Sequence, residues 1–194
     1  KGLAMGLVGA GNIGTAVAAL LAPPLAQALG WQTVYGLAAI GILLPMVVMI
    51  VFAREPEDRD AHASLRDHVA CLFEKDGWAF SLIYAVTFGG FIGLATFLPS
   101  YFYDQFGVSK IEAGQLTMLA AFMGAATRIL GGWLSDHWGG VNTLTVVLVV
   151  ISGSLLLCGL SSQSLALTVI CFLVCFAALG AGNGALFQLV PLRW

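Results

Sequence analysis

The chain has 194 residues, of which 59% are hydrophobic and 9% are charged, and its mean hydropathy is +0.94. Soluble domains carry about 25% charged residues, so the composition argues against a water-soluble protein. With 8 Lys plus Arg and a formal net charge of −2, the chain cannot build the basic face that binding to nucleic acid requires.

Long runs without Asp, Glu, Lys or Arg indicate where the chain crosses a bilayer. These runs cover residues 2–53, 77–103 and 137–192, and residues 113–135 contain only Arg128. A crossing helix needs about 20 apolar residues, so each of the two longest runs must fold back once. The sequence therefore predicts an all-α polytopic membrane protein with six crossings.

Breaks within the two longest runs define the helices. The first run is expected to break at Leu29-Gly30-Trp31, after Pro23 and Pro24, because proline disfavours helix continuation and glycine permits a tight turn. The last run is expected to break in the polar cluster at residues 161–164. The predicted helices cover residues 2–28, 32–52, 78–103, 111–134, 141–160 and 165–192.

One long connection, residues 54–76, separates the second and third predicted helices. It holds 11 of the 18 charged residues. Together with Lys1 and Arg193 it places six Lys or Arg on one side of the membrane, against Lys110 on the other, so the connection is predicted to be cytoplasmic. Apolar residues within 64–80 favour a short interfacial helix there.

Arg128 is the most informative residue inside a predicted helix. A guanidinium at that depth costs at least about 2.5–3.5 kcal/mol, so something must compensate for it. One interpretation is that the side chain reaches the cytoplasmic interface near Ser135 and Asp136. The other, which we prefer, is that it faces a water-filled pathway and binds an anion with its planar fork of donors.

The predicted helices contain no acidic residue away from their ends. Asp104, Glu112 and Asp136 all lie at helix ends. Proton-coupled carriers of cations commonly use an acid inside the membrane, whereas an anion carrier needs positive potential and neutral donors. The sequence therefore favours an anionic substrate.

Glycines cluster in three of the predicted helices, where they serve either close helix packing or the bending of helices during gating. The clusters comprise Gly2, Gly6, Gly9, Gly11 and Gly14, then Gly89, Gly90 and Gly93, and finally Gly180, Gly182 and Gly184. Asn12 and Asn183 accompany the first and last clusters. Each amide bonds across helices or contacts a polar substrate, and the sequence leaves both possibilities open.

Tyr84 and Phe88 lie four residues apart, on one helix face. They form either an apolar packing stripe or an aromatic wall against which a flat anion could pack. His137, beside Asp136, is expected to be a loop residue.

The four cysteines lack metal or redox spacing, so we interpret them as small packing residues. They are Cys71, Cys158, Cys171 and Cys175. No metal site, cofactor or enzymatic activity is expected, because no nucleophile and base pair is discernible. The chain opens on Lys1 rather than on a start methionine, so it is expected to be a piece of a longer protein.

Two sets of motifs resemble known families. Residues 131–140 resemble the cytoplasmic loop motif of the major facilitator superfamily, although Val141-Asn142 follows where basic residues are usual. The loop-motif positions are Gly131, Gly132, Asp136, Gly139 and Gly140. Residues 9–14 with Leu21-Ala22-Pro23, residues 84–93 and residues 180–188 resemble helices 5, 7 and 10 of the nitrate/nitrite porter family.

This resemblance implies an incomplete major facilitator fold with six of its twelve helices, numbers 5 to 10. Residues 1–53 would end the N-terminal half, residues 54–76 would link the halves, and residues 77–194 would begin the C-terminal half. Helices 1–4, 11 and 12 of the same protein would then be partners of this chain within the lipid bilayer.

The resemblance also implies a substrate site. Arg128 matches the helix 8 arginine of the family, whose helix 2 partner lies outside this sequence, while Tyr84, Phe88 and Asn12 match other pocket residues. The implied function is transport of nitrate or nitrite, by exchange or with protons, in the bacterial inner membrane. A carrier of another small anion or organic acid and a membrane receptor or sensor are the alternatives.

Overall fold

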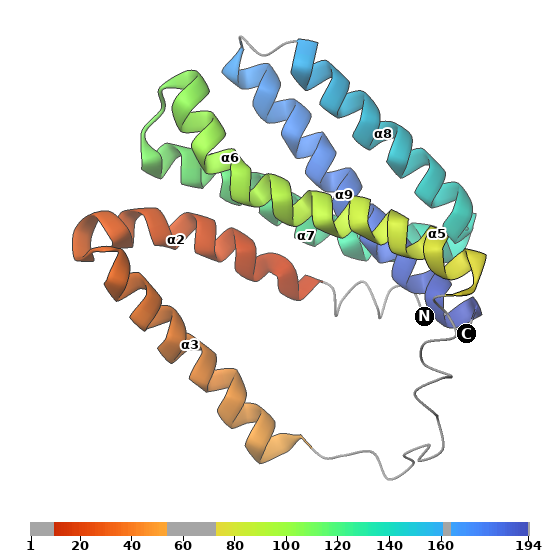
Figure 1. Ribbon diagram of the computed structural model, residues 1–194, viewed down its shortest axis with the longest axis horizontal. Helices are drawn as coiled ribbons and strands as arrows, with labels where there is room; N and C mark the ends of the chain where they lie inside the picture. The colour runs from red at the N-terminus through yellow and green to blue at the C-terminus, as the bar shows by residue number, and fades with distance from the viewer. Residues whose placement is uncertain (1–9, 54–72, 161–163, 194) are drawn as a thin grey trace. The chain divides into compact units, whose positions relative to one another are not determined.

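The computed structural model describes residues 10–53, 73–160 and 164–193, and the regular structure in these ranges is helical throughout (Figure 1). By contacts the chain divides into two compact units. One comprises Lys1–Leu20 with Ala79–Trp194, and the other comprises Leu21–Trp78. The predicted boundaries between the halves of a carrier stay a prediction, since residues 54–72 lie outside the described residues.

The first helices follow the predicted break at glycine. A short 3₁₀ turn η1 (Ala10–Asn12) leads into α2 (Ile13–Leu29), and α3 (Trp31–Phe52) follows after Gly30, whose φ is +83°. Only this glycine interrupts the helical path in residues 13–52, because Pro23 and Pro24 lie inside α2. Residues 2–9 of the first predicted helix lie outside the described residues.

The third predicted helix contains an irregular segment that the sequence did not indicate. It consists of α5 (Lys75–Tyr84), a π-helical turn η3 (Ala85–Gly89) and α6 (Gly90–Phe106). A π turn inserts an extra residue into a helix and is frequently found at functional sites. Of the expected interfacial helix, residues 64–72 are not described, and residues 75–80 belong to α5 itself.

The last three helices lie within a few residues of their predicted bounds. They are α7 (Lys110–Trp138), α8 (Gly140–Leu160) and α9 (Leu165–Arg193). A capping box starts α7, because the Ser109 N–H donates to the Glu112 carboxylate at 2.8 Å and the Glu112 N–H donates to the Ser109 hydroxyl at 3.2 Å. Gly139, with a φ of +86°, makes the turn into α8.

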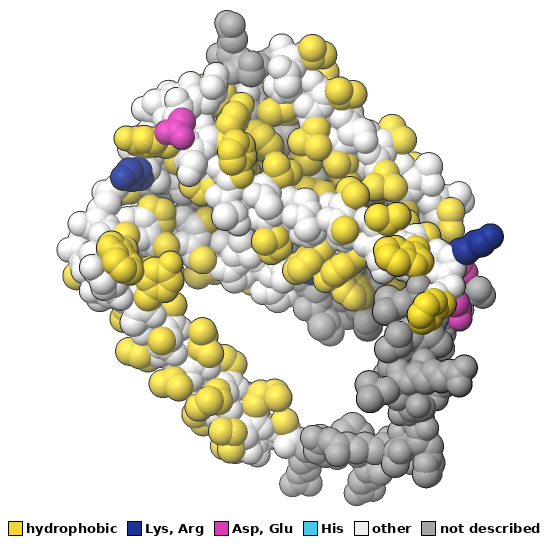
Figure 2. Space-filling view, in the orientation of Figure 1, with side chains coloured by type: hydrophobic (Ala, Val, Ile, Leu, Met, Phe, Trp, Pro, Cys, Tyr) yellow, Lys and Arg dark blue, Asp and Glu magenta, His cyan; other side chains and the backbone are white. Residues whose placement is uncertain are grey.

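Five helical stretches of the described chain are long and apolar enough to span a membrane. They are Trp31–Phe52, Lys75–Phe106, Lys110–Trp138, Gly140–Leu160 and Leu165–Val190. The shorter α2 has 17 residues. Many large hydrophobic side chains of these helices are exposed, and α3 contains no buried residue (Figure 2). These features agree with the predicted all-α membrane fold.

Helix α9 packs against α7 and α8 and also touches η3 (Figure 1). Glycines permit the contact between α7 and α9. A Cβ atom at Gly180 would collide with the carbonyl oxygen of Gly124, and one at Gly131 would collide with the backbone of Ala181. The two backbones therefore touch directly, as small residues allow in membrane helices.

Candidate functional site

Arg128 lies in the interior of its unit. Its side chain is 3% exposed and belongs to the buried face of α7. At about 1.5 Å per residue, the ten residues from Arg128 to Trp138 place it roughly 15 Å from the C-terminal end of the helix. This burial places the guanidinium among neighbouring helices instead of at the exposed end of α7.

The amide of Asn12, the last residue of η1, meets the guanidinium fork. Its oxygen accepts hydrogen bonds from Nη1 at 3.0 Å and from Nη2 at 2.8 Å. We assign the amide orientation that turns its oxygen toward Arg128, because the opposite orientation would set two groups of N–H donors against each other. One neutral oxygen therefore engages both terminal nitrogens of the arginine.

Aromatic rings from η3 and α6 line the guanidinium on another side. Its central carbon lies 5.5 Å from the ring centroid of Phe88 and 5.8 Å from that of Phe91. Both distances fall within the range of cation–π attraction. The ring of Tyr84 stacks on Phe88, with centroids 5.0 Å apart and planes inclined by 13°. The structure thus brings Arg128, Asn12, Phe88 and Tyr84 into one cluster.

Backbone contacts with α9 fix the position of Arg128. A Cβ at Gly184 would collide with the carbonyl oxygen of Arg128, so the two helices leave no room for a side chain there. One residue earlier in α7, the Thr127 hydroxyl lies 2.9 Å from the carbonyl oxygen of Ala177 in α9 and also 2.9 Å from that of Met123 in its own helix, and it can donate its single proton to either. This contact between helices lies next to the turn of α7 that carries Arg128 and joins that turn to α9.

A buried polar contact joins η3 and α9 beside this cluster. Thr87 and Asn183 are both fully buried, and 3.5 Å separates the Thr87 hydroxyl from the Asn183 amide oxygen. The same hydroxyl donates to the Ile83 carbonyl oxygen at 2.9 Å, so its single proton is already engaged. Among the described residues, the Asn183 amide nitrogen has no hydrogen-bond partner.

The motif at residues 131–140 is mostly helical, and α7 continues through residues 135–138, beyond the predicted helix end at residue 134. Residues 131–138 form the C-terminal part of α7, and only Gly139 leaves the helix, before Gly140 starts α8. His137 is likewise helical instead of being a loop residue, and its Nδ1 lies 2.8 Å from the carbonyl oxygen of Trp133. Asp136 is exposed near the end of α7.

The other predicted glycines have different surroundings. Gly182 packs tightly, because a Cβ there would lie 2.8 Å from Thr87 Cγ2. At Gly90 a Cβ would meet Leu179 at an ordinary 3.4 Å. Four further glycines have no atom of the described chain within 4 Å of such a Cβ, and Gly9 lies outside the described residues. The four are Gly11, Gly14, Gly89 and Gly93.

Three of the four cysteines are free and buried, and Cys71 lies outside the described residues. The three are Cys158, Cys171 and Cys175. No group of three or more His, Cys, Asp or Glu side chains suited to a metal occurs within residues 10–53, 73–160 and 164–193.

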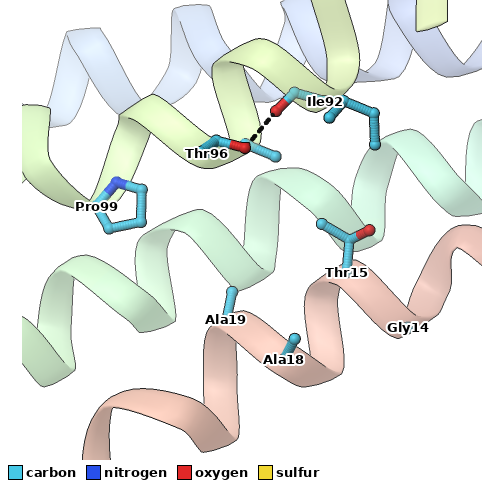
Figure 3. Close-up of a pocket in the computed structure, with 8 residues that line it drawn as sticks. Gly14, Thr15, Ala18, Ala19, Ile92, Thr96 and Pro99 are labelled. Carbon is cyan, nitrogen blue, oxygen red and sulfur yellow. Dashed lines mark hydrogen bonds between the residues drawn. The ribbon is translucent and has the colours of Figure 1, made fainter. Parts of the chain in front are cut away.

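An open cavity of about 550 Å³ lies between α2 and α6 (Figure 3). It starts two residues after Asn12 in α2 and one residue after Phe91 in α6. Its lining is small and mainly apolar, with Thr15 and Thr96 as the polar side chains, and the Thr96 hydroxyl donates to the Ile92 carbonyl oxygen at 2.9 Å. None of the four predicted substrate residues lines it, so the cavity adjoins the arginine cluster along both helices without containing it.

Sequence reasoning missed three aromatic residues in or beside the cluster. Phe91 follows Phe88 by three residues, a spacing that could have identified it as part of the same helix face. Phe187 of α9 meets Tyr84 edge-on at 5.8 Å, and Phe176 of α9 meets Phe91 at 5.2 Å. These two contacts join helices far apart in the sequence, and no local pattern indicates which faces meet.

Comparison with known proteins gives two results. Residues 1–193 match the family model described as Major Facilitator Superfamily. Proteins named "Probable nitrate transporter NarT" are also similar. The one from Staphylococcus haemolyticus is 34% identical over 192 residues, which are 98% of this chain and 49% of that protein. Those from Staphylococcus epidermidis and Staphylococcus aureus are 33% and 35% identical over the same shares. The chain spans about half the length of the curated relatives that it matches.

Proposed function

This chain belongs to the Major Facilitator Superfamily, and we propose that it forms half of a carrier that moves nitrate or nitrite across a bacterial membrane. The names of its relatives from Staphylococcus support the substrate class. Because the chain spans about half of those relatives, the complete carrier would add helices 1–4, 11 and 12. The activity that we propose for the protein is transport and not catalysis.

The observation that carries the proposal is the geometry at Arg128. Both terminal nitrogens of its buried guanidinium donate to one oxygen, at 2.8 and 3.0 Å. A trigonal oxyanion offers oxygens of the same kind in the same plane, and it adds the negative charge that the amide lacks. The arginine is therefore equipped to bind a planar anion such as nitrate.

The aromatic residues complete the proposed site. Phe88 lies beside the guanidinium and stacks on Tyr84, so the two rings form one flat apolar wall. A planar, weakly hydrated anion could pack on this wall while the Tyr84 hydroxyl donates a hydrogen bond to it. The site would then select the anion by its shape and charge, without a metal or cofactor.

Alternating access supplies the transport step in this proposal. The two halves of the carrier would rock about a central site, at which Arg128 and an arginine from helix 2 neutralise the anion. The predicted helices contain no acidic residue away from their ends, so an empty pair of arginines would be electrostatically unfavourable. Bound anion would therefore ease the conformational return, which favours exchange or proton-accompanied uptake.

The proposed orientation follows from charge. With residues 54–76 cytoplasmic, six Lys or Arg lie on the inner side of the plasma membrane. Cys71 allows a direct test in a variant that lacks the other cysteines. A membrane-impermeant thiol reagent should label it in inside-out vesicles only, and labelling in right-side-out vesicles would reverse the topology.

The function itself is tested with the full-length protein in proteoliposomes. We expect uptake of labelled nitrate that unlabelled nitrate and nitrite suppress and that chloride and formate do not. Suppression by formate or chloride alone would indicate a carrier of another small anion. The absence of any anion-dependent flux would instead favour a receptor or sensor.

A further inference from the structure

Three consecutive residues of α9 contact the elements that carry the arginine cluster. A Cβ atom at Gly182 would lie 2.8 Å from Thr87 Cγ2 in η3. A Cβ atom at Gly184 would collide with the carbonyl oxygen of Arg128 in α7. Asn183 lies between these glycines, and its amide oxygen is 3.5 Å from the Thr87 hydroxyl. One short segment of α9 therefore touches both the π turn and the turn of α7 that carries the guanidinium.

The polar pair of Thr87 and Asn183 is enclosed by described residues. Both side chains are fully buried within the described part of the chain, so segments outside it cannot reach them in this arrangement. A buried polar group is costly unless it has a hydrogen-bond partner. The two groups therefore favour the packing of η3 on α9 in which they meet.

The hydroxyl and the amide complement each other in one orientation of the amide. The Thr87 hydroxyl donates its single proton to the Ile83 carbonyl oxygen at 2.9 Å, so its oxygen is left to accept. The Asn183 amide nitrogen has no partner among the described residues. Since the oxygen and nitrogen of an amide are told apart by their hydrogen bonds, half a rotation of the amide would bring this donor to the Thr87 hydroxyl oxygen.

The π turn η3 needs an external contact of this kind. It holds one more residue than an α-helical turn, and in an α-helix one residue corresponds to about 100° of rotation. Loss of the π form would therefore rotate the helix before the turn relative to the helix after it. Phe88 of the π turn and Phe91 of α6 both lie near the guanidinium, with centroids 5.5 and 5.8 Å from its central carbon. The joint approach of the two rings depends on the π form.

We infer that Asn183 is a positioning residue of the substrate site. Its contact with Thr87 fixes the π form of η3 on α9 and so keeps the Phe88 ring beside Arg128. The inference rests on the proposed function and deepens it, because it names a residue that sets the affinity for a planar anion without touching the anion.

The test is a double-mutant cycle on the Kd for nitrate, measured by calorimetric titration of the purified full-length carrier. Asn183→Ala removes the amide, so the Kd should rise by at least about twofold and by no more than in Phe88→Leu. In the Phe88→Leu background the same change should not alter the Kd, because the ring through which it acts is absent. An unchanged Kd in Asn183→Ala, or an equal rise in both backgrounds, would overturn the inference.

Thr87 allows the same test from the other side of the contact. Thr87→Val keeps the shape of the side chain but lacks the hydroxyl, so its Kd should rise as in Asn183→Ala. Thr87→Ser retains the hydroxyl and should have the Kd of the wild type. The two variants also serve if Asn183→Ala folds poorly, and the same Kd in both would overturn the inference.

Hydrogen exchange of the carrier without nitrate adds a readout that does not depend on the substrate. In Asn183→Ala the backbone amides of residues 85–89 should exchange at least about tenfold faster than in the wild type. Asn142→Ala is the matched control, because this exposed asparagine of α8 donates within its own helix, to the Trp138 carbonyl oxygen at 3.2 Å. It should change neither the exchange at residues 85–89 nor the Kd.

The two readouts separate the inference from the proposed function. A wild type that does not bind nitrate would overturn the proposed function. Unchanged exchange at residues 85–89 in Asn183→Ala would overturn the inference, whether or not the carrier binds nitrate.

Discussion

Arg128 places a positive charge among the buried side chains of its unit. Placing it in a membrane helix costs at least about 2.5–3.5 kcal/mol. The Asn12 oxygen offsets part of that cost through two charge-assisted hydrogen bonds, and Phe88 and Phe91 contribute cation–π attraction. The Asn12 amide and the two rings are neutral, so none of these three contacts cancels the positive charge.

Phe88 is the ring that we expect to matter most for substrate affinity. Phe88→Leu keeps an apolar side chain but removes the π face beside the guanidinium, a contribution of about 0.5–2 kcal/mol. The Kd for nitrate should therefore rise by roughly twofold to thirtyfold in a titration of the full-length carrier.

The matched control is Phe97→Leu in α6. Phe97 is exposed, and its ring contacts Tyr101 at 5.6 Å. This variant should leave the Kd unchanged. Equal affinity of the Phe88 variant and the wild type would show that the ring has no part in binding.

The sequence could identify single residues of the site whose side chains are energetically costly inside a membrane. Arg128 and Asn12 attracted attention because charged and amide side chains are expensive in lipid, and the structure brings them within hydrogen-bonding distance. The contact between Thr87 and Asn183 could not be predicted, because it depends on which faces of η3 and α9 meet. Only the three-dimensional arrangement of the helices contains that information.

At the scale of helices, the contact between α7 and α9 holds the site together. Gly180 and Gly184 lie on α9 where its backbone touches that of α7, at Gly124 and Arg128 respectively. The Thr127 hydroxyl also meets the Ala177 carbonyl oxygen of α9 at 2.9 Å. Any change that separates the two helices should therefore also displace the arginine.

Gly180→Ala tests this contact. Its new methyl group would collide with the Gly124 carbonyl oxygen, and overpacking of this kind costs about 1–3 kcal/mol. The free energy of unfolding should fall by about that amount in reversible denaturation of the purified carrier.

Gly153→Ala in α8 is the matched control, because no atom of the described chain lies within 4 Å of its Cβ position. This variant should be neutral or more stable by up to about 1 kcal/mol, since alanine favours a helix more than glycine does. If both variants have the same stability, the close approach of α7 and α9 is not the source of packing energy.

Helix positions were largely predictable, whereas their irregularities were not. Charge-free runs located the helices to within a few residues, because lipid exposure requires long apolar segments. The predicted helix ended at residue 134, yet Ser135, Asp136 and His137 lie on the last turn of α7. The π turn η3 arises within an unbroken apolar run, in which no residue pattern marks an extra residue per turn.

At the scale of the whole molecule, the chain spans about half the length of its relatives. The match covers 98% of this chain but only 49% of the relative from Staphylococcus haemolyticus, so that relative is about twice as long. The proposed transport is therefore tested with the full-length protein.

The most direct test of the account compares nitrate uptake by the full-length wild type and by Arg128→Lys in proteoliposomes. Lysine keeps the charge but loses the planar fork, so uptake at low nitrate should fall by at least about tenfold. Arg59→Lys makes the same chemical change in the charged segment at residues 54–76 and should leave uptake unchanged. Wild-type rates of nitrate uptake in Arg128→Lys would contradict the claim that this guanidinium binds the transported anion.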